Sequence, residues 1–294
     1  MDQIINDITK SFIETLHVSH DEIHPSRLNF DNIHNMVSQY VNFSENNGYL
    51  SLGSDNKLTA ALLYKIVETD LKKYLYLQYY FSKKEVRRCG LVSRLIDKAL
   101  TYAKNNNIKE VSACVQDDNE ASRRLITEKF AFAPLEKYYI RNLGSGMAGP
   151  GQDISYKKTE MIKHGAYLVN TITKHLLNFE GLNHRTDMET VIKDIISRYE
   201  NSDGYYIIAD EGDIKNFNFA LCSVVRSFFK DYLSIDYYAL SGHAQALLDK
   251  ISNLANRLGL IEIGINVHVN DKTTLKLLES SCFINVDTNY VKLL

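Results

Sequence analysis

The chain has 294 residues, 45% of them apolar and 24% charged, which is typical of packed soluble domains and long enough for two of ordinary size. The formal charge of -2 excludes an overall field that would attract nucleic acid or an anionic membrane, so any anion site must be local. No apolar run approaches the roughly 20 residues that span a bilayer. We therefore expect no nucleic-acid partner and no membrane insertion.

Histidines are concentrated near the N-terminus, where His17, His20 and His24 lie within two helical turns. This spacing is compatible with a metal site, but Pro25 ends the segment and no cysteine or acidic cluster elsewhere has ligand spacing. A solvated loop is the favoured interpretation, and no metal is predicted.

The cysteines are dispersed, with no CxxC pair, and no signal-like segment precedes the first amphipathic stretch. This pattern indicates free thiols in a reducing environment, so we expect a cytoplasmic protein. The four cysteines are Cys89, Cys114, Cys222 and Cys282.

The chain repeats itself once, with an offset of about 150 to 165 residues. Each half has helices, then strands rich in Tyr, Leu, Ile and Val, then a glycine, a helix and a further strand, helix and strand. This predicts a mixed α/β (α+β) fold of two tandem domains, 1–163 and 164–294, each a mixed central sheet flanked by helices. The matching segments are 5–16 with 169–180, 36–50 with 192–206, 74–81 with 232–239, and 90–115 with 242–267.

Between the two halves, residues 142–151 read NLGSGMAGPG. This stretch is either the interdomain linker or, as we favour, a long hairpin loop, because residues 153–163 read as a strand that completes the first half. The predicted boundary therefore falls near residue 164.

The stretch EVRRCGLVSRLI, residues 85–96, leads from a strand into a helix. A helix N-terminus presents unpaired backbone N–H groups and the positive end of its dipole, and a glycine there lets a ligand approach closely. Lys83, Lys84, Arg87 and Arg88 add positive charge around Gly90. The fragment alone also fits a plain helix N-terminus with solvated arginines.

The surroundings of this loop resemble the GCN5-related N-acetyltransferase (GNAT) family. The resemblance runs from Arg-x-x-Gly-x-small, at Arg87, Gly90 and Val92, through the following strand to Asn119 and Phe132. It implies that the loop holds the pyrophosphate of acetyl-CoA and that the preceding strand pairs with the pantetheine. The implied cofactor residues are Tyr80, Phe81, Ser82, Arg87, Arg88, Cys89, Gly90, Leu91, Val92, Ser93, Asn119 and Ser122.

The sequence departs from the family pattern at the residues of the chemistry. Cys114 stands where several relatives have a Glu base and Ile126 where many have a Tyr acid, and the segment from Asn119 to Phe132 is one residue longer than usual. A base must therefore come from elsewhere, and Glu68, Tyr79 or a chain of waters are the candidates.

Three other residues of the first half have two interpretations each. Tyr138 and Tyr139 either line the acceptor pocket or, as aromatic strand residues more often do, form core. Cys114 is more readily interpreted as inert packing than as a nucleophile.

The second half lacks six residues and all four cations of the loop, and Ala239 stands at the arginine position, although Gly242 and Ala244 keep the Gly-x-Ala part. We predict a degenerate domain that serves as a wall, a lid or a homodimer surface. Asp236, which matches Gln78, either faces a substrate or, as we favour, is a polar residue on a half-exposed strand.

The resulting hypothesis is an N-acetyltransferase that moves an acetyl group directly from acetyl-CoA to a primary amine of a small molecule or peptide. The alternatives are a non-catalytic acyl-CoA sensor and a scaffold without cofactor. Aminoacyl transfer from tRNA is disfavoured, because it requires a basic face.

Overall fold

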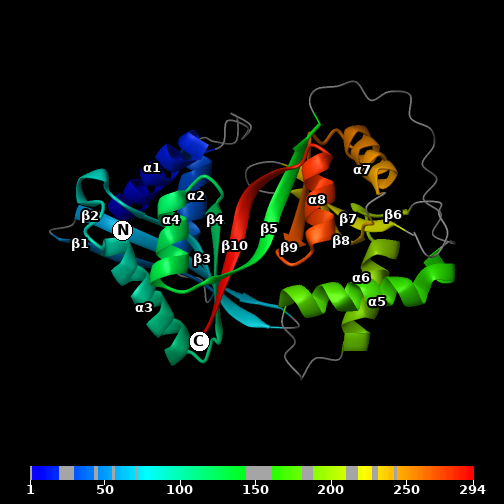
Figure 1. Cartoon of the computed structure of the whole chain (residues 1–294). Helices are drawn as coiled ribbons and strands as arrows, with labels where there is room; N and C mark the ends of the chain where they lie inside the picture. The colour runs from blue at the N-terminus through cyan, green and yellow to red at the C-terminus, as the bar shows by residue number, and fades with distance from the viewer. Residues whose placement is uncertain are drawn as a thin grey trace.

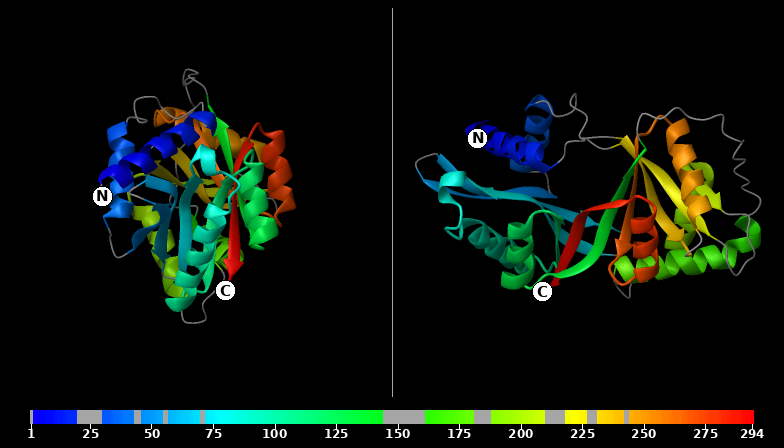
Figure 2. Two further views of the ribbon diagram at one scale, coloured as in Figure 1. Left: turned by 90° about the vertical axis from the view of Figure 1, so that its left-hand side faces the viewer. Right: turned by 45° about the horizontal axis from the view of Figure 1, so that its top comes forward.

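The computed structural model describes residues 2–19, 30–42, 46–54, 57–69, 72–143, 161–180, 188–209, 218–226, 231–241 and 244–294. In this part of the chain one ten-stranded sheet runs through the whole molecule, with strand order β1-β2-β3-β4-β10-β5-β9-β8-β7-β6 (Figures 1 and 2). The strands are β1 (Asn47–Ser54), β2 (Lys57–Glu68), β3 (Lys73–Ser82), β4 (Glu110–Gln116), β5 (Ala133–Asn142), β6 (Tyr205–Ala209), β7 (Phe219–Arg226), β8 (Asp231–Ala239), β9 (Glu262–His268) and β10 (Ile284–Leu293).

Helices cover both faces of this sheet in each half of the molecule (Figure 1). Apolar residues at helical spacing form their buried faces, as Leu95, Ile96, Ala99 and Ala103 do in α3. No described helix has both the length and the apolar character required to cross a bilayer. The helices are α1 (Asp2–Ser19), α2 (Phe30–Val41), α3 (Leu91–Asn105), α4 (Glu120–Arg124), α5 (Met161–Glu180), α6 (Met188–Asn201), α7 (Gln245–Arg257) and α8 (Lys272–Ser280).

The order of elements is the same in the two halves, and the strand order reads the same from either edge when β1 to β5 are matched with β6 to β10. The halves are thus related by an approximate two-fold axis between β5 and β10, which lie antiparallel at the centre (Figure 1). This confirms the predicted mixed α/β fold with a repeated arrangement of helices around a mixed sheet.

The two halves exchange their last strands. Strand β10, from the end of the chain, pairs with β4 of the first half, and β5 pairs with β9 of the second half. The side chains follow the strands: Tyr290 of β10 lies in the core beneath α3, and Tyr139 of β5 lies in the core beneath α7. Neither half therefore has a complete sheet or core without a strand from the other.

This exchange differs from the prediction that residues 153–163 form the strand that completes the first half. Residues 161–163 begin helix α5, and the rest of the segment lies outside the described residues. The strand beside β4 is β10, about 170 residues further along the chain than β4. The boundary at residue 163 stays a prediction about sequence units, because the exchanged strands cross it.

Candidate acetyl-CoA and acceptor site

Strands β3 and β4 run parallel but separate toward their carboxyl ends. Their paired residues are Leu75 with Val111, Tyr76 with Ser112 and Leu77 with Ala113, and no pairing follows. From Gln78 to Ser82, β3 remains bonded to β2 alone. The edge of β3 that faces β4 therefore offers backbone N–H and C=O groups along an opening in the sheet.

Gln78 is the residue at which the strands separate. It is an extra residue in β3, because Leu63 of β2 pairs with Tyr79 and the next residue, Tyr64, pairs with Leu77. Such a bulge bends the strand and turns a side chain aside. The hydroxyl of Tyr40, on α2, donates to the Gln78 side chain at 3.3 Å.

The loop after β3 ends in two left-handed residues, Arg88 with φ of 68° and Gly90 with φ of 72°. Gly90 precedes the first turn of α3 and has no side chain, so no cap residue bonds the N–H groups of that turn. A Cβ atom on Gly90 would meet nothing within 4 Å, so it is the backbone conformation that favours glycine. The loop has the geometry of an anion site.

Of the four predicted cations, Lys83 is paired with Asp7 of α1 at 3.1 Å. Lys84, Arg87 and Arg88 are exposed around the loop, as is Cys89. Long-range attraction of a phosphate therefore depends on three of the four cations.

Tyr80 and Ser122, both predicted to contact the cofactor, meet across the opening between β3 and α4. Burial raises the pKa of Tyr80, and a hydrogen bond with the Ser122 side chain opposes part of this rise. Asn119 accepts a hydrogen bond from the Ser122 backbone N–H at 3.1 Å and so begins α4. The extra residue between Asn119 and Phe132 is accommodated by a π-helical turn at Leu125–Lys129.

The remaining predicted cofactor residues take different positions. Phe81 is buried beneath α1 and α2, away from the face that carries α3. Leu91 and Val92 pack against the core of the α3 face, and Ser93 is buried. Ser82 ends β3 and is half-buried. These residues fit main-chain contacts better than contacts through their side chains.

On the face of the sheet that carries α1 and α2, three polar groups lie where β3 and β4 separate. The Tyr76 hydroxyl hydrogen bonds to the Cys114 thiol, and Asp287 of the exchanged strand lies close to both. Cys114 is solvent-accessible, but the surrounding protein and the charges of Asp287 and Glu136 raise the pKa of its thiol. Asp287 was not predicted as a site residue, because the repeat in the sequence does not show that β10 joins the sheet of the first half.

The two predicted bases lie at different distances from this place. Glu68 ends β2, is exposed and pairs with Lys73 at 3.1 Å, roughly 16 Å along β3 from Gln78 at the usual strand rise. Tyr79 follows Gln78 directly, packs on Phe12 of α1 and lies 3.4 Å from the Ser11 hydroxyl. The structure thus brings Tyr79 near the separation point but not Glu68.

The second half repeats the separation of strands but fills it. Strand β8 pairs with β9 over three residue pairs ending at Ile235 with Ile265, and Asp236 is the extra residue at the position of Gln78. Tyr238, at the position of Tyr80, is buried and donates to the backbone oxygen of Asn266 across the opening at 3.3 Å. A hydrogen bond therefore closes the edge that remains open in the first half.

His175 of α5 completes this closure. Its ring contacts Tyr237 and Tyr238, with centroids 5.2 and 5.6 Å away. Burial lowers the pKa of His175 to about 4, so the imidazole is neutral at pH 7. The repeat places Ser11 at the corresponding position of the first half, where a small side chain leaves the opening free.

The connection from strand to helix is also shorter in the second half. Eight residues, 83–90, separate β3 from α3, whereas five, 240–244, separate β8 from α7. Ala244, now buried, precedes α7, and Gly242 lies outside the described residues. The described part of the second half thus has no counterpart of the cationic loop.

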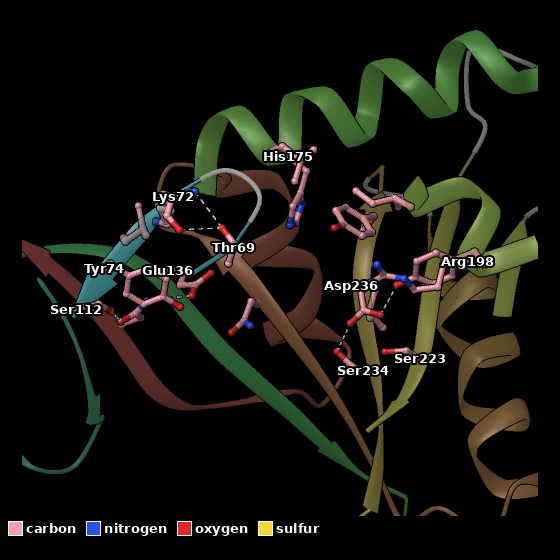
Figure 3. A pocket seen from close by; sticks show the side chains of 18 of the residues that line it. Thr69, Lys72, Tyr74, Ser112, Glu136, His175, Arg198, Ser223, Ser234 and Asp236 are labelled. Carbon is pink, nitrogen blue, oxygen red and sulfur yellow. Dashed lines mark hydrogen bonds between the residues drawn. The ribbon is translucent and has the colours of Figure 1, made fainter. Parts of the chain in front are cut away.

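A cavity of about 420 Å³ lies on the face of α5 and α6, between the two halves (Figure 3). Thr69, Lys72 and Tyr74 stand on its first-half side, and Asp236 and Ser234 stand opposite (Figure 3). Asp236 is half-buried and accepts hydrogen bonds from Tyr199 and from Ser234, so the structure places this residue in a polar cavity. Asp236 is a polar, half-buried strand residue, as we favoured from the sequence, and it also lines this cavity.

The sequence favoured a core position for both Tyr138 and Tyr139 of β5, and the structure puts Tyr139 in the core. Tyr139 is 1% exposed and bonds Glu279. Tyr138 extends over Gly264, where a Cβ atom would lie 2.1 Å from the Tyr138 hydroxyl.

No group of three His, Cys, Asp or Glu side chains suited to a metal ion occurs among the described residues, and the side chains of His17, His20 and His24 lie outside them.

Comparison with known proteins agrees with this fold. Residues 4–132 match the protein-family model of the acetyltransferase (GNAT) family. The structure is similar to that of a GCN5-related N-acetyltransferase from Sphaerobacter thermophilus, with 11% sequence identity and a TM-score of 0.52. The similarity covers 89% of this chain and 85% of the other. A glucosamine N-acetyltransferase region of a fungal multi-domain beta-N-acetylglucosaminidase is similar at 11% identity and a TM-score of 0.54, covering 90% of this chain and 34% of that chain.

A search of curated proteins finds no match to this sequence. The structural similarities, at 11% identity, show only a common fold. The likeness to the GNAT family in sequence comes from residues 4–132. Residues 4–132 thus match the GNAT acetyltransferase family, and the fold of the chain is similar to that of a GCN5-related N-acetyltransferase.

Proposed function

We propose that the protein transfers an acetyl group from acetyl-CoA to a primary amine, directly and in the first half. The observation that carries this proposal is the opening between β3 and β4 beside a left-handed, cationic loop at the start of α3. Both features occur together in the first half, whereas in the second the opening is closed by Tyr238 and His175. The match of residues 4–132 to the GNAT family model supports acyl transfer in general.

In the proposed complex, the pyrophosphate binds the loop that ends at Arg88 and Gly90, and the pantetheine pairs with the free edge of β3 from Gln78 to Ser82. This edge has unused N–H groups, and one of them would polarise the thioester carbonyl. Tyr80 and Ser122 line the side that carries α4. The thioester then reaches the point where β3 and β4 separate.

The acceptor enters from the opposite face, beside Cys114, Tyr76 and Asp287. The neutral amine attacks the carbonyl carbon, a C–N bond forms, the C–S bond breaks, and the CoA thiolate leaves. Asp287 accepts the proton that the amine nitrogen loses, directly or through water. Burial and the neighbouring carboxylates keep the Cys114 thiol protonated, which disfavours an acetyl-cysteine intermediate.

Non-catalytic acyl-CoA binding is the second candidate. Two residues favour it, because neither can serve as the acid or base that the family has at the same position. The Cys114 thiol is held protonated, and Ile126 is apolar and fully buried. Calorimetry with acetyl-CoA should show one site per chain. Release of free thiol with a panel of small amines and peptide N-termini then distinguishes the two functions, because a sensor binds acetyl-CoA without turnover. A cytoplasmic location stays a prediction.

A further inference from the structure

The cavity between the two halves contains a carboxylate, that of Asp236, which forms no ion pair with another described residue. Asp236 accepts hydrogen bonds from the hydroxyls of Tyr199, Ser234 and Ser223, all of them neutral donors. None of the ion pairs formed by the described residues includes Asp236. A carboxylate withdrawn from water normally has a cationic partner, because its desolvation is costly otherwise.

The other charged groups of the cavity do not fill this role. Lys72 pairs with Glu110 at 2.8 Å, and both side chains are largely buried, with 15% and 16% exposed. Arg198 lines the cavity from α6 but is exposed. His175 is neutral at pH 7, because burial lowers its pKa to about 4. The lining thus leaves a net negative charge near Asp236, to which Glu136 adds a second carboxylate.

The remaining lining suits an organic cation. Tyr205 and Tyr237 line the cavity, and an ammonium group is attracted to the face of such rings. Tyr74 lines it as well, with the Lys72 ammonium over its ring at 5.0 Å. The volume of about 420 Å³ lies in the usual range for small-molecule sites. Hydroxyl, amide and carboxylate groups around the walls can bond the N–H groups of an amine.

We propose that this cavity binds a small alkylammonium compound that the protein does not acetylate, with Asp236 as the principal anchor. Acetylation there would need a thioester in the opening between β8 and β9, which Tyr238 and His175 occupy. The ligand would contact side chains from both halves, Tyr74 on one side and Asp236 on the other (Figure 3). It would thus link the halves as a structural or regulatory ligand, independently of the proposed transfer reaction.

Calorimetry with the full chain and 1,4-diaminobutane tests this site. We expect one binding event at pH 7, at least ten-fold weaker in Asp236→Asn and unchanged in Asp203→Asn, which removes one exposed carboxylate elsewhere in the second half. The neutral isostere 1,4-butanediol should not bind. Unchanged acetyl-CoA binding in Asp236→Asn would show that this variant is folded.

Equal binding of the diamine to Asp236→Asn and to the wild type would overturn the proposal, as would equal binding of the diol. A Gly90→Asp variant separates this result from the proposed function. It should lose acetyl-CoA and keep the diamine. Loss of the diamine in Gly90→Asp together with its retention in Asp236→Asn would place the amine in the first half and also overturn the proposal.

Discussion

Tyr199 donates a hydrogen bond to Asp236, and the same contact recurs in the other half as Tyr40 to Gln78. In each half a tyrosine of the second helix supports the bulged residue at which two parallel strands separate. One half has a neutral amide at this position and the other a carboxylate. The two sites therefore share a backbone but differ in the charge that they offer.

This difference predicts a pH dependence of stability. Burial raises the pKa of Asp236 from 3.8, although hydrogen bonds from Ser223, Ser234 and Tyr199 oppose the shift. The folded protein then keeps a proton that the unfolded chain has released, so this carboxyl lowers the free energy of unfolding as pH rises from 3.8 through its folded pKa. In Asp236→Asn this contribution to the fall in the free energy of unfolding with rising pH is absent.

Urea unfolding of both proteins between pH 3.5 and 7 measures this effect. The stability of Asp236→Asn relative to the wild type should increase with pH over the lower part of this range. Asp203→Asn is the control for the loss of one exposed carboxylate. Parallel pH profiles for wild type and Asp236→Asn would contradict the raised pKa.

Gly90→Asp should abolish acetyl-CoA binding. The substitution puts a side chain in a left-handed conformation, at roughly 1–2 kcal/mol, and adds a negative charge where a pyrophosphate is expected. Gly259→Asp is a matched control, because Gly259 follows α7 with φ of 69° and its Cβ would also meet nothing within 4 Å. Calorimetry should show that both variants lose similar stability and that Gly259→Asp still binds acetyl-CoA.

Asp287→Asn should slow acetyl transfer about 100-fold, the usual effect of losing a positioned proton acceptor, and leave the affinity for acetyl-CoA unchanged. Asp249→Asn, on an exposed helix position of the second half, is the control with the same charge change. Thiol release under saturating acetyl-CoA gives the rate, and its decrease should be smaller at high pH, where more amine is neutral. Equal rates for Asp287→Asn and wild type would remove Asp287 from the mechanism.

Tyr290→Ala should destabilise the protein by about 3 kcal/mol, because it removes an aromatic ring from the core beneath α3. Ile284→Ala, in the same strand, should have little effect, since Ile284 is 61% exposed. Urea unfolding measures both. If loss of Tyr290 left the stability of the first half unchanged, the strand exchange would not hold in solution.

Cys114 should react slowly with iodoacetamide at pH 7, although solvent reaches it. Burial, with help from Asp287 and Glu136, raises the pKa of its thiol, so little thiolate is present. Cys89, exposed in the loop before α3, is the internal reference. Peptide mass spectrometry of partly alkylated protein should show Cys89 modified well before Cys114, and faster labelling of Cys114 would argue for an activated thiol.

The sequence was enough to predict much of the fold. The internal repeat identified both sets of helices and strands, because periodic apolar residues at equivalent places need the same buried faces. The loop that ends at Gly90 was predicted from local chemistry, and the structure gives that glycine the left-handed conformation that only glycine adopts easily. The extra residue before Phe132 appeared in the sequence, and the π-helical turn explains where it goes.

The sequence did not reveal which strand lies beside β4. Strand pairing over a long separation leaves no local signal, so β10 was assigned to the second half and Asp287 was overlooked. The missing cations predicted a degenerate second half, but its closed strand opening became visible only from the contacts of His175 with Tyr237 and Tyr238. Glu68 was a candidate base from the sequence, and only the register shows how far it lies from Gln78.

The exchanged strands also bear on how the chain is made. During synthesis β5 emerges at residue 142, and the strand that separates it from β4 begins only at residue 284. Until then the first half has an unfilled position in its sheet, with backbone groups of β4 exposed to other chains on the ribosome. We expect the cofactor site to mature late, after the second half has left the ribosome, and nascent chains stalled before β10 to depend on chaperones.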